Sequence, residues 1–417
     1  MIDYLSGYCA RKERMSSTAS GWRSYAAAAG PMLLVALVVV YVLLLRARLF
    51  PAGGVRLSDF QCFWSAAKVA LTEAPAKVYD IGAFGDAQRA LLGYTGGLAC
   101  KFIYTPVSLL LFLPLALLPY TASAVAWLAA TATAYALALR ALLPGWPAVL
   151  PFLALPAVFV NACYMQNGFL SAALLAAATG LLATRPILAG VCLGCFAYKP
   201  QLGLVTPLAL AAAGRWRAFM AAAATVLGLA AAASAAFGAE IWAVFLTGVV
   251  GDAGGWLDGT TRRNGADMPS VFAAVRMLVG GPAGWAYAAQ AAAAAGACAL
   301  MVTAIRRGPG ARAEGALAAA AIPLATPYLF IYDQVILAVP LAWMLAEARR
   351  TGFLRWERAA FWALLVSPAL AYAATLAWGW PLGPLVSAGV FAAVLRRVHR
   401  LSAGGAPVRG RPREALA

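Results

Sequence analysis

Apolar runs long enough to span a lipid bilayer recur along most of this chain. Hydrophobic residues make up 63% of the 417 positions and charged residues only 11%, which lies outside the range of soluble domains. The sequence therefore predicts an all-α polytopic membrane protein. Thirteen apolar segments are candidate crossings: about 31–50, 104–119, 121–142, 147–164, 168–183, 187–199, 201–213, 217–237, 284–305, 315–330, 333–346, 358–377 and 380–396.

The positions of Lys and Arg reduce these candidates to about 12 transmembrane helices. If all thirteen segments crossed, the Arg-rich loops 306–312 and 349–358 would share a side with the first loop, against the positive-inside rule. Segment 104–119 is the weakest candidate because three prolines interrupt it, so we expect a re-entrant or surface-lying helix there. Most of the +17 net charge then lies inside. This charge indicates topology and attraction to anionic lipid, not nucleic-acid binding.

The same topology divides the chain into two tails, a membrane domain and two outside loops. Residues 1–30 are a cytoplasmic N-terminal tail, 31–400 the transmembrane domain, and 401–417 a disordered, basic cytoplasmic tail. The first outside loop, 51–120, holds amphipathic juxtamembrane helices and the re-entrant segment. The second outside loop is 238–283.

Cysteine and histidine limit the chemistry. Cys62 and Cys100 share the first outside loop, where an oxidising compartment could join them; the sequence leaves open whether it does. Cys192 and Cys195 lie in an apolar run without a second pair nearby, which favours packing over metal binding. The single histidine, His399, lies in the basic tail. We therefore expect no His-based metal site and no Ser-His triad.

The stretch from Arg56 to Lys68 places a carboxylate, Asp59, at the membrane surface. Ser58 can serve as the N-cap of a helix with Asp59 in its first turn. The helix dipole favours the ionised form of Asp59, as a general base requires. Asp59 is either such a base or only a helix cap. Apolar side chains recur on one face of this predicted interfacial helix: Phe60, Phe63, Trp64, Ala67 and Leu71.

Polar side chains interrupt the apolar sequence again further on. Lys199 would pair or snorkel, or would hold a lipid phosphate. Asp267 is a plausible N-cap, and Arg276 lies on the polar side of the following helix, available for a phosphate or only for water. Asp333 begins a predicted span, where it is either a cap or part of a site. The interrupted segments are Lys101 to Pro106, Tyr164 to Gly168, Ala197 to Gln201, Asp267 to Arg276 and Thr326 to Gln334.

These motifs, in this order, resemble glycosyltransferase family 87. Each motif is short, and their order over about 50–340 carries the likeness. Members of this family are GT-C-fold, polyprenol-phosphate-mannose-dependent α-1,2-mannosyltransferases. The matching stretches are the S-D-F-x-x-F-W-x-A-A helix at Asp59, Tyr104-Thr105-Pro106 with Pro114-Leu115, Gln166-Asn167-Gly168, Lys199-Pro200, Met268-Pro269-Ser270-Val271-Phe272, and Pro327 through Tyr332-Asp333.

The resemblance implies an inverting transfer of a sugar, mannose in the family, from a polyprenyl-phosphate donor to a hydroxyl of a glycolipid or glycan acceptor. It implies no nucleotide, cofactor or obligatory metal. The expected place is the periplasmic face of the inner membrane, with membrane lipids as further partners. Asp59 would be the general base. Lys199, Arg276 and Lys101 would bind the donor phosphate, and Tyr104, Gln166, Asn167, Tyr332 and Asp333 would bind substrate.

Alternatives remain open. Tyr332 stands where family members often have histidine, and Gln166-Asn167-Gly168 where they have glycine-glutamine, which leaves the donor sugar and the acceptor undetermined. A twin-carboxylate hydrolase is less favoured, because no second acid lies near Asp59 in sequence, although Asp80 and Asp333 could approach in space. A transporter or lipid flippase would also bind amphipathic cargo, but no inverted repeat is evident. An inactive scaffold on the same fold is the third alternative.

Overall fold

The computed structural model describes residues 32, 34–47, 58–93, 100–250 and 265–403. Within these ranges the secondary structure is helical, with no strand. The predicted N-terminal tail and residues 404–417 lie outside the described residues, whereas Leu401–Ala403 belong to the last helix.

The first part of the chain alternates short and long helices, and many begin with a proline at their first position. After the helix Leu34–Ala47 the elements are α2 (Phe60–Thr72), η1 (Pro75–Tyr79), α3 (Ile81–Leu92), α4 (Pro106–Phe112), η2 (Leu113–Leu117), α5 (Tyr120–Leu142), α6 (Trp146–Leu153), α7 (Pro156–Tyr164), α8 (Gly168–Leu181), α9 (Pro186–Gly194), η3 (Cys195–Tyr198), α10 (Pro200–Gly203) and α11 (Val205–Ala212). Proline is preorganised for a helix start, where its missing N–H has no intrahelical partner.

Longer helices dominate the remainder. The elements are α12 (Trp216–Phe237), α13 (Ile241–Phe245), η4 (Leu246–Val250), α16 (Val271–Val279), α17 (Gly284–Ile305), α18 (Ala311–Ala325), η5 (Ile331–Leu337), α19 (Ala338–Thr351), α20 (Glu357–Trp378) and α21 (Gly383–Ala403).

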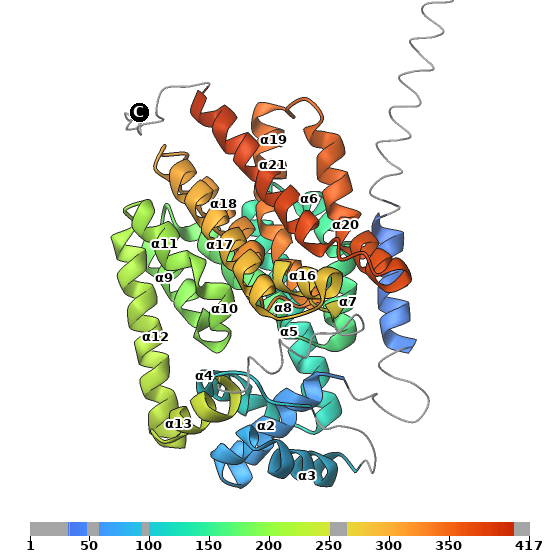
Figure 1. The fold of residues 1–417 in the computed structure, drawn as a ribbon, viewed down its shortest axis with the longest axis vertical. Helices are drawn as coiled ribbons and strands as arrows, with labels where there is room; N and C mark the ends of the chain where they lie inside the picture. Colours follow the sequence, from blue (N-terminus) through green and yellow to red (C-terminus); the bar gives the residue numbers. More distant parts are fainter. Residues whose placement is uncertain (1–31, 33, 48–57, 94–99, 251–264, 404–417) are drawn as a thin grey trace, which may run out of the picture.

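The helices form a bundle that is closed at one end by a layer of short helices (Figure 1). This end layer consists of α2, η1, α3, α4, η2 and α13, and it lies opposite the C-terminal end of α21. It has its own apolar core around Phe60 and Phe63, separate from the larger core of the bundle. The site described below lies where α7, α8, η3 and η5 meet this layer.

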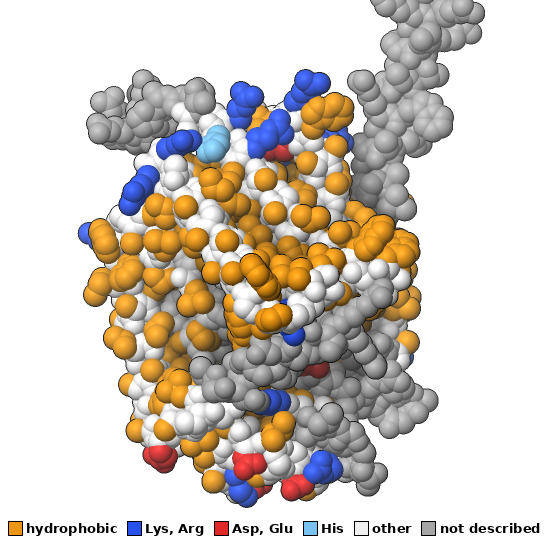
Figure 2. All heavy atoms as spheres, viewed as in Figure 1, with side chains coloured by type: hydrophobic (Ala, Val, Ile, Leu, Met, Phe, Trp, Pro, Cys, Tyr) orange, Lys and Arg blue, Asp and Glu red, His pale blue; other side chains and the backbone are white. Residues whose placement is uncertain are grey.

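Charged side chains are distributed unevenly between the two ends. Figure 2 shows Lys and Arg gathered at the C-terminal end of the bundle, and acidic side chains mainly at the end layer, where some basic ones also lie. Hydrophobic side chains cover the surface between them. A basic end with an apolar surface beside it, as on the face shown, is the arrangement that the positive-inside rule and the bilayer require.

Among the described residues, five helices are long and apolar enough to cross a membrane: α5, α12, α17, α20 and the continuous stretch Ile331–Thr351 formed by η5 and α19. The pair α6 and α7, bent by 64°, adds a sixth if it is one span. By their length and composition, these helices are those of a polytopic membrane protein. The count of 12 crossings stays a prediction, because several expected spans are shorter helices broken at proline or glycine: Gly168–Leu181, Pro186–Tyr198 and Pro200–Ala212.

The helix that follows Asp59 is not the surface helix that the sequence predicted. α2 begins at Phe60, Asp59 occupies the N-cap position, and no side chain caps the helix. Its buried residues point in several directions, because α2 packs against η1, α3, α4, η2 and α5. Leu71, expected on the apolar face, is 49% exposed. The apolar face of α2 exists as the sequence pattern predicts, but it packs within the protein's own end layer.

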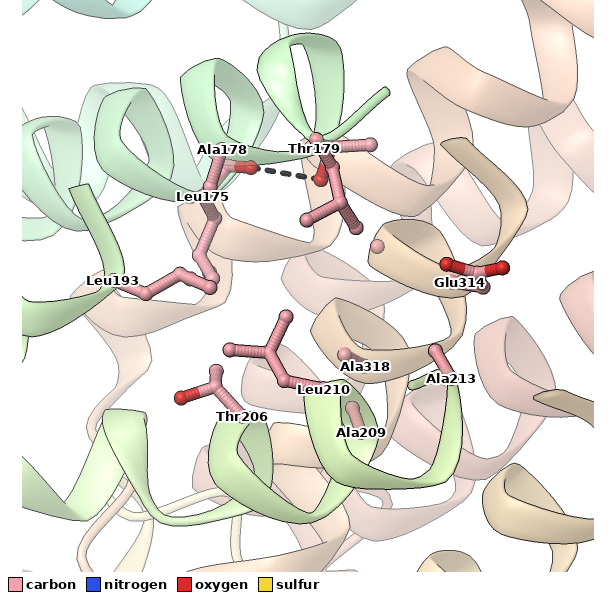
Figure 3. Close-up of a pocket in the computed structure, with 12 residues that line it drawn as sticks. Leu175, Ala178, Thr179, Leu193, Thr206, Ala209, Leu210, Ala213, Glu314 and Ala318 are labelled. Carbon is pink, nitrogen blue, oxygen red and sulfur yellow. Dashed lines mark hydrogen bonds between the residues drawn. The ribbon is translucent and has the colours of Figure 1, made fainter. Parts of the chain in front are cut away.

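A small cavity of about 30 Å³ lies near the basic end, between α8, α9, α11 and α18 (Figure 3). Its walls are apolar apart from a few groups. The Thr179 hydroxyl donates to the Leu175 carbonyl at 2.8 Å, and Glu314 is paired with Arg215 at 2.8 Å. These polar groups are already engaged, so this cavity offers no evident reactive group.

The segment Pro106–Leu117 would extend only about 18 Å as an α-helix, less than the ~30 Å hydrocarbon core. We therefore expect both of its ends on one side of the membrane. In a background lacking the free cysteines, exposed Lys77→Cys and Leu118→Cys should react with an impermeant thiol reagent from the same side. Exposed Ala141→Cys, in the last turn of the candidate span α5, should react from the other. Labelling of the first two from opposite sides would contradict this placement.

Candidate functional site

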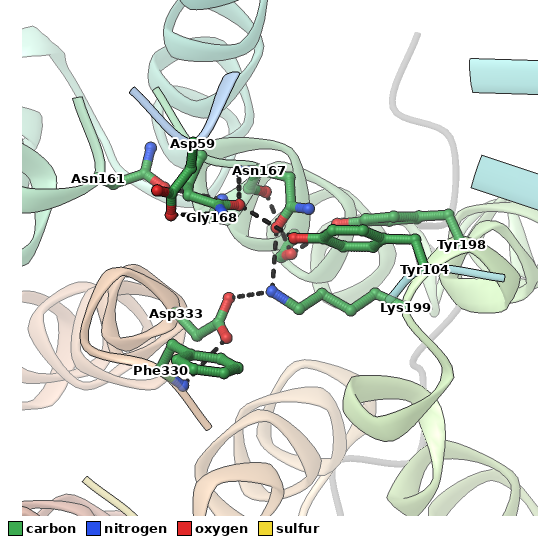
Figure 4. A network of polar contacts seen from close by, with 11 residues as sticks. Asp59, Tyr104, Asn161, Asn167, Gly168, Tyr198, Lys199, Phe330 and Asp333 are labelled. Atoms are coloured by element: carbon green, nitrogen blue, oxygen red, sulfur yellow. Dashed lines mark hydrogen bonds and ion pairs between the residues drawn. The ribbon is translucent and has the colours of Figure 1, made fainter. Parts of the chain in front are cut away.

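Five segments far apart in sequence bring polar side chains together at the inner edge of the end layer (Figure 4). Asp59 precedes α2, Tyr104 precedes α4, and Gln166 and Asn167 form the turn between α7 and α8. Lys199 follows η3, and Asp333 lies in η5. Seven of the nine residues singled out from the sequence lie in or against this polar network: Asp59, Tyr104, Gln166, Asn167, Lys199, Tyr332 and Asp333.

Asp59 is held by an amide and not by a cation. Its Oδ2 accepts a hydrogen bond from Gln166 Nε2 at 2.9 Å. No ion pair involves Asp59 among the described residues, and its side chain is half-buried. Burial raises the pKa of Asp59 above its ordinary value, the Gln166 hydrogen bond opposes this, the charge of Asp267 adds to it, and Lys199 opposes it. The expected helix-dipole effect is thus outweighed by desolvation.

The Gln166 amide links Asp59 to Tyr104. Its Oε1 accepts a hydrogen bond from the Tyr104 hydroxyl at 3.1 Å, while its Nε2 is used by Asp59. The turn that presents it is tight. Met165, in front of it, has a left-handed backbone with φ of 51°, a conformation that costs free energy for a non-glycine residue. Such strain at a turn carrying network residues is typical of a functional site.

Gly168 closes that turn at a point where only glycine fits. A Cβ there would lie 2.4 Å from the Tyr332 carbonyl oxygen and 2.6 Å from Asn161 Oδ1. Asn161 Oδ1 also accepts a hydrogen bond from the Gly168 N–H at 2.9 Å. The turn is therefore packed directly onto the segment that carries Asp333.

Lys199 and Asp333 form a buried ion pair at the centre of the network. Lys199 Nζ lies 2.6 Å from Asp333 Oδ1, and the two side chains are 2% and 0% exposed. Nζ also donates to Asn167 Oδ1 at 3.0 Å and lies 5.1 Å from the centre of the Tyr332 ring. The other Asp333 oxygen accepts from the Phe330 N–H at 3.2 Å. Asp333 is thus both a local cap and the partner of Lys199.

A cavity of about 320 Å³ opens beside the ion pair. Its wall is mainly apolar and aromatic, with Lys199 and Lys101 as its cationic residues. Such a chamber, apolar with a few convergent polar groups, suits an amphipathic ligand. The lining residues are Lys101, Ile103, Tyr104, Thr105, Tyr198, Lys199, Pro200, Gln201, Leu204, Phe245, Val249, Tyr328, Phe330 and Tyr332.

Arg276 is placed elsewhere. Its Nη1 donates to the Gly281 carbonyl just beyond the end of its own helix, α16, and it is not among the residues that line this cavity. The N-cap of α16 is Ser270, whose side chain accepts from the Ala273 N–H, so the expectation that Asp267 caps this helix is wrong. A hydroxyl at the N-cap position satisfies the same orphan donor.

Asp267 instead joins the site's surroundings. Its carboxylate accepts a hydrogen bond from the Tyr372 hydroxyl at 3.1 Å, and its carbonyl accepts from the Ile331 N–H at 2.9 Å. Burial raises the pKa of Asp267, and the Tyr372 hydrogen bond opposes this. The sequence singled out Asp267 only as a helix cap, and it did not point to Tyr372 or Asn161 as neighbours of the site. The one available signal was a polar residue, Asn161, within an apolar run.

Removing the cation of the buried pair should destabilise the fold. Lys199→Met leaves Asp333 buried without its partner, which we expect to lower the free energy of unfolding by about 3–5 kcal/mol. The exposed pair of Lys77 with Glu73 supplies the matched control, since Lys77→Met should cost only about 0–1 kcal/mol. Adding Asp333→Asn to Lys199→Met should recover part of the loss. Unfolding in detergent measures all four proteins, and equal stability of the two single variants would refute this role.

Comparison with known proteins tests the resemblance noted in the sequence. Neither a curated protein nor a solved structure matches this chain. The family model of glycosyltransferase family 87 matches residues 102–327. This stretch includes Tyr104, Gln166, Asn167 and Lys199, and it lies between Asp59 and Asp333. The match covers more than half of the chain and confirms the resemblance: the protein belongs to glycosyltransferase family 87.

Proposed function

We propose that this membrane glycosyltransferase transfers a sugar, mannose by analogy with its family, from a polyprenyl-phosphate donor to a hydroxyl of a glycolipid or glycan acceptor, with inversion and with Asp59 as the general base. The observation that carries the assignment is the contrast between the two carboxylates of the network. Asp333 is fully buried and bound to Lys199, whereas Asp59 is half-buried and held only by the Gln166 amide. Asp59 is therefore the one that can meet an acceptor.

The environment of Asp59 suits proton transfer. Burial raises its pKa, which makes the carboxylate a stronger base, and the Gln166 hydrogen bond opposes this rise by favouring the ionised form. Gln166 also fixes one carboxylate oxygen, while the other has no hydrogen-bond partner among the described residues. In this proposal Gln166 orients the base and does not bind the sugar.

The cavity supports an isoprenoid phosphate donor. Its apolar and aromatic wall matches an isoprenoid chain, and its two lysines match a phosphate. An ammonium group has three donors. Asn167 and Asp333 engage two donors of Lys199, which leaves one for a phosphate oxygen. Lys101 is the second cation. The role of Arg276 in phosphate binding stays a prediction, and its hydrogen bond to Gly281 does not favour it.

The reaction that these groups support is a single displacement. Asp59 takes the proton of the acceptor hydroxyl while that oxygen forms a bond to the anomeric carbon. The bond from this carbon to the phosphate oxygen breaks, and the electron pair leaves with polyprenyl phosphate. The leaving phosphate keeps a charge that Lys199 and Lys101 can stabilise, so no acid must protonate it.

Charge supports the proposed orientation. If the basic end of the bundle faces the cytoplasm, then the end layer and Asp59 face the periplasm, where a polyprenyl-phosphate donor would be used. The proposal therefore includes an end layer that faces the periplasm and a location in the inner membrane, as expected from the sequence.

Replacing the base should abolish transfer without unfolding the protein. Asp59→Asn is nearly isosteric and should lower the rate of sugar transfer roughly 10²–10⁴-fold while leaving donor binding and the melting temperature close to wild type. Asp80→Asn is the matched control: Asp80 caps α3 by accepting from the Ala83 N–H, and asparagine caps as well. Transfer from a labelled polyprenyl-phosphate sugar by purified protein is the assay. Wild-type turnover by Asp59→Asn would end the base assignment.

The pH dependence should report the Gln166 hydrogen bond. A general base works deprotonated, so transfer should fall as the pH drops through the raised pKa of Asp59. Gln166→Leu removes the hydrogen bond that lowers this pKa, so the acid limb of the pH–rate profile should move to higher pH. Tyr104→Phe, which spares the bond from Gln166 to Asp59, should move it less. An acid limb that stays in place in Gln166→Leu would refute the coupling.

A further inference from the structure

One non-helical segment, Cys100 to Thr105, supplies part of the site and part of the cavity. Tyr104 reaches the Gln166 amide, and Lys101 and Thr105 line the cavity. The segment lies between α3 and α4 and has no helical hydrogen bonds of its own. The position of its side chains must therefore be fixed by contacts with neighbouring elements.

The start of this segment is tied down twice. Cys100 forms a disulfide with Cys62, with the two Cα atoms 5.8 Å apart. Gln88 of α3 holds the backbone of the same residue on both sides: its Nε2 donates to the Cys100 carbonyl at 2.9 Å, and its Oε1 accepts from the Cys100 N–H at 3.1 Å. Gln88 is 0% exposed. A buried glutamine used in this way is a specific clamp, because leaving it unsatisfied would be costly.

Two further bonds hold the other end of the segment. The Tyr79 hydroxyl donates to the Tyr104 carbonyl at 3.0 Å, and the Thr105 hydroxyl donates to the Ala197 carbonyl at 2.7 Å. Ala197 lies two residues before Lys199. The segment thus links α2, which follows Asp59, to η3, which precedes Lys199.

The disulfide connects the base to its neighbour. Cys62 lies one turn after Asp59 on α2, and Cys100 lies four residues before Tyr104. We propose that the Cys62–Cys100 disulfide and the Gln88 clamp are positioning groups that fix Tyr104 against the Gln166 amide bound to Asp59, and Lys101 in the wall of the cavity, so that rapid sugar transfer depends on the oxidised protein. This inference rests on the proposed function and adds to it a dependence on redox state.

The chemistry of the bond sets its compartment. Its formation removes two protons and two electrons from the two thiols, and a disulfide-donating thiol oxidoreductase accepts them by thiol–disulfide exchange. Such oxidants act outside the cytosol. Dithiothreitol reverses the bond by supplying two electrons and two protons and becoming a cyclic disulfide itself. Cys100 is partly exposed and Cys62 is buried, so the reductant can approach the bond from the side of Cys100.

Loss of the disulfide should spare the fold, because α2 is also held by apolar packing in the core of the end layer. The expected effect is on placement. A misplacement near 1 Å at a reacting centre can cost about 10²-fold in rate, so we expect kcat to fall roughly 10–100-fold in the reduced protein. Donor affinity should also fall, because Lys101 moves with the segment.

The experiment compares full-length wild type in its oxidised, dithiothreitol-reduced and re-oxidised forms. Sugar transfer, binding of a fluorescent polyprenyl phosphate, and the melting temperature are each measured. We expect the transfer rate and the affinity for polyprenyl phosphate to fall on reduction and to return on re-oxidation. The melting temperature should stay close to that of the oxidised protein. The variant Cys62→Ser/Cys100→Ser should be slow and insensitive to dithiothreitol. Cys192→Ser/Cys195→Ser, the matched control, should behave as wild type. Gln88→Leu should lower kcat while its disulfide still forms.

The outcomes separate the two proposals. If complete reduction leaves transfer and binding unchanged, the positioning role is overturned and the proposed function is not. The same holds if the rate of transfer falls only in proportion to a lower melting temperature, because the loss is then one of folding. An oxidised protein that binds the lipid but never transfers sugar overturns the proposed function, and in that case the redox dependence of binding still decides the positioning role.

Discussion

The buried contact between Lys199 and Asp333 sets the layout of this site. Neither charge could remain in the apolar interior without the other, so the start of α10 and η5 must lie together, at 2.6 Å between the charged atoms. Asn167 completes the shell of the ammonium group. The cavity opens beside this pair, and the same arrangement leaves Asp59 as the carboxylate of the network without a cation among the described residues.

Two opposing effects then tune Asp59. Burial raises its pKa and favours the neutral acid, whereas the Gln166 hydrogen bond favours the ionised form. The Gln166 amide, itself fixed by Tyr104, supplies an intermediate environment in which the carboxylate is oriented and its pKa is raised only in part. The strained turn at Met165 and the absence of space beside Gly168 show what holds that amide in place. A helix dipole, which the sequence suggested as the main influence, is secondary to these contacts.

Much of the site could be predicted from sequence because polar residues are costly in apolar segments and stand out there. Lys199 and Asp333 stand out in this way, the resemblance to glycosyltransferase family 87 added Tyr104, Gln166, Asn167 and Tyr332, and the structure brings these residues together. Roles that depend on tertiary packing were not predictable. Arg276 donates a hydrogen bond to the Gly281 carbonyl just beyond its own helix. Asp267 does not cap α16, and α2 is covered by neighbouring helices. Hydropathy alone also does not determine the number of membrane crossings, because proline and glycine divide apolar runs into short helices.

The central claim is that Asp59 acts as a base in one displacement and not as a nucleophile in two. Stereochemistry tests this directly, because a single displacement inverts the anomeric centre and a covalent glycosyl-enzyme intermediate retains it. NMR of the product formed from a polyprenyl-phosphate sugar of known anomeric configuration is the measurement. The account predicts a product whose glycosidic linkage has the opposite configuration to that of the donor. A product with the donor's configuration would contradict it.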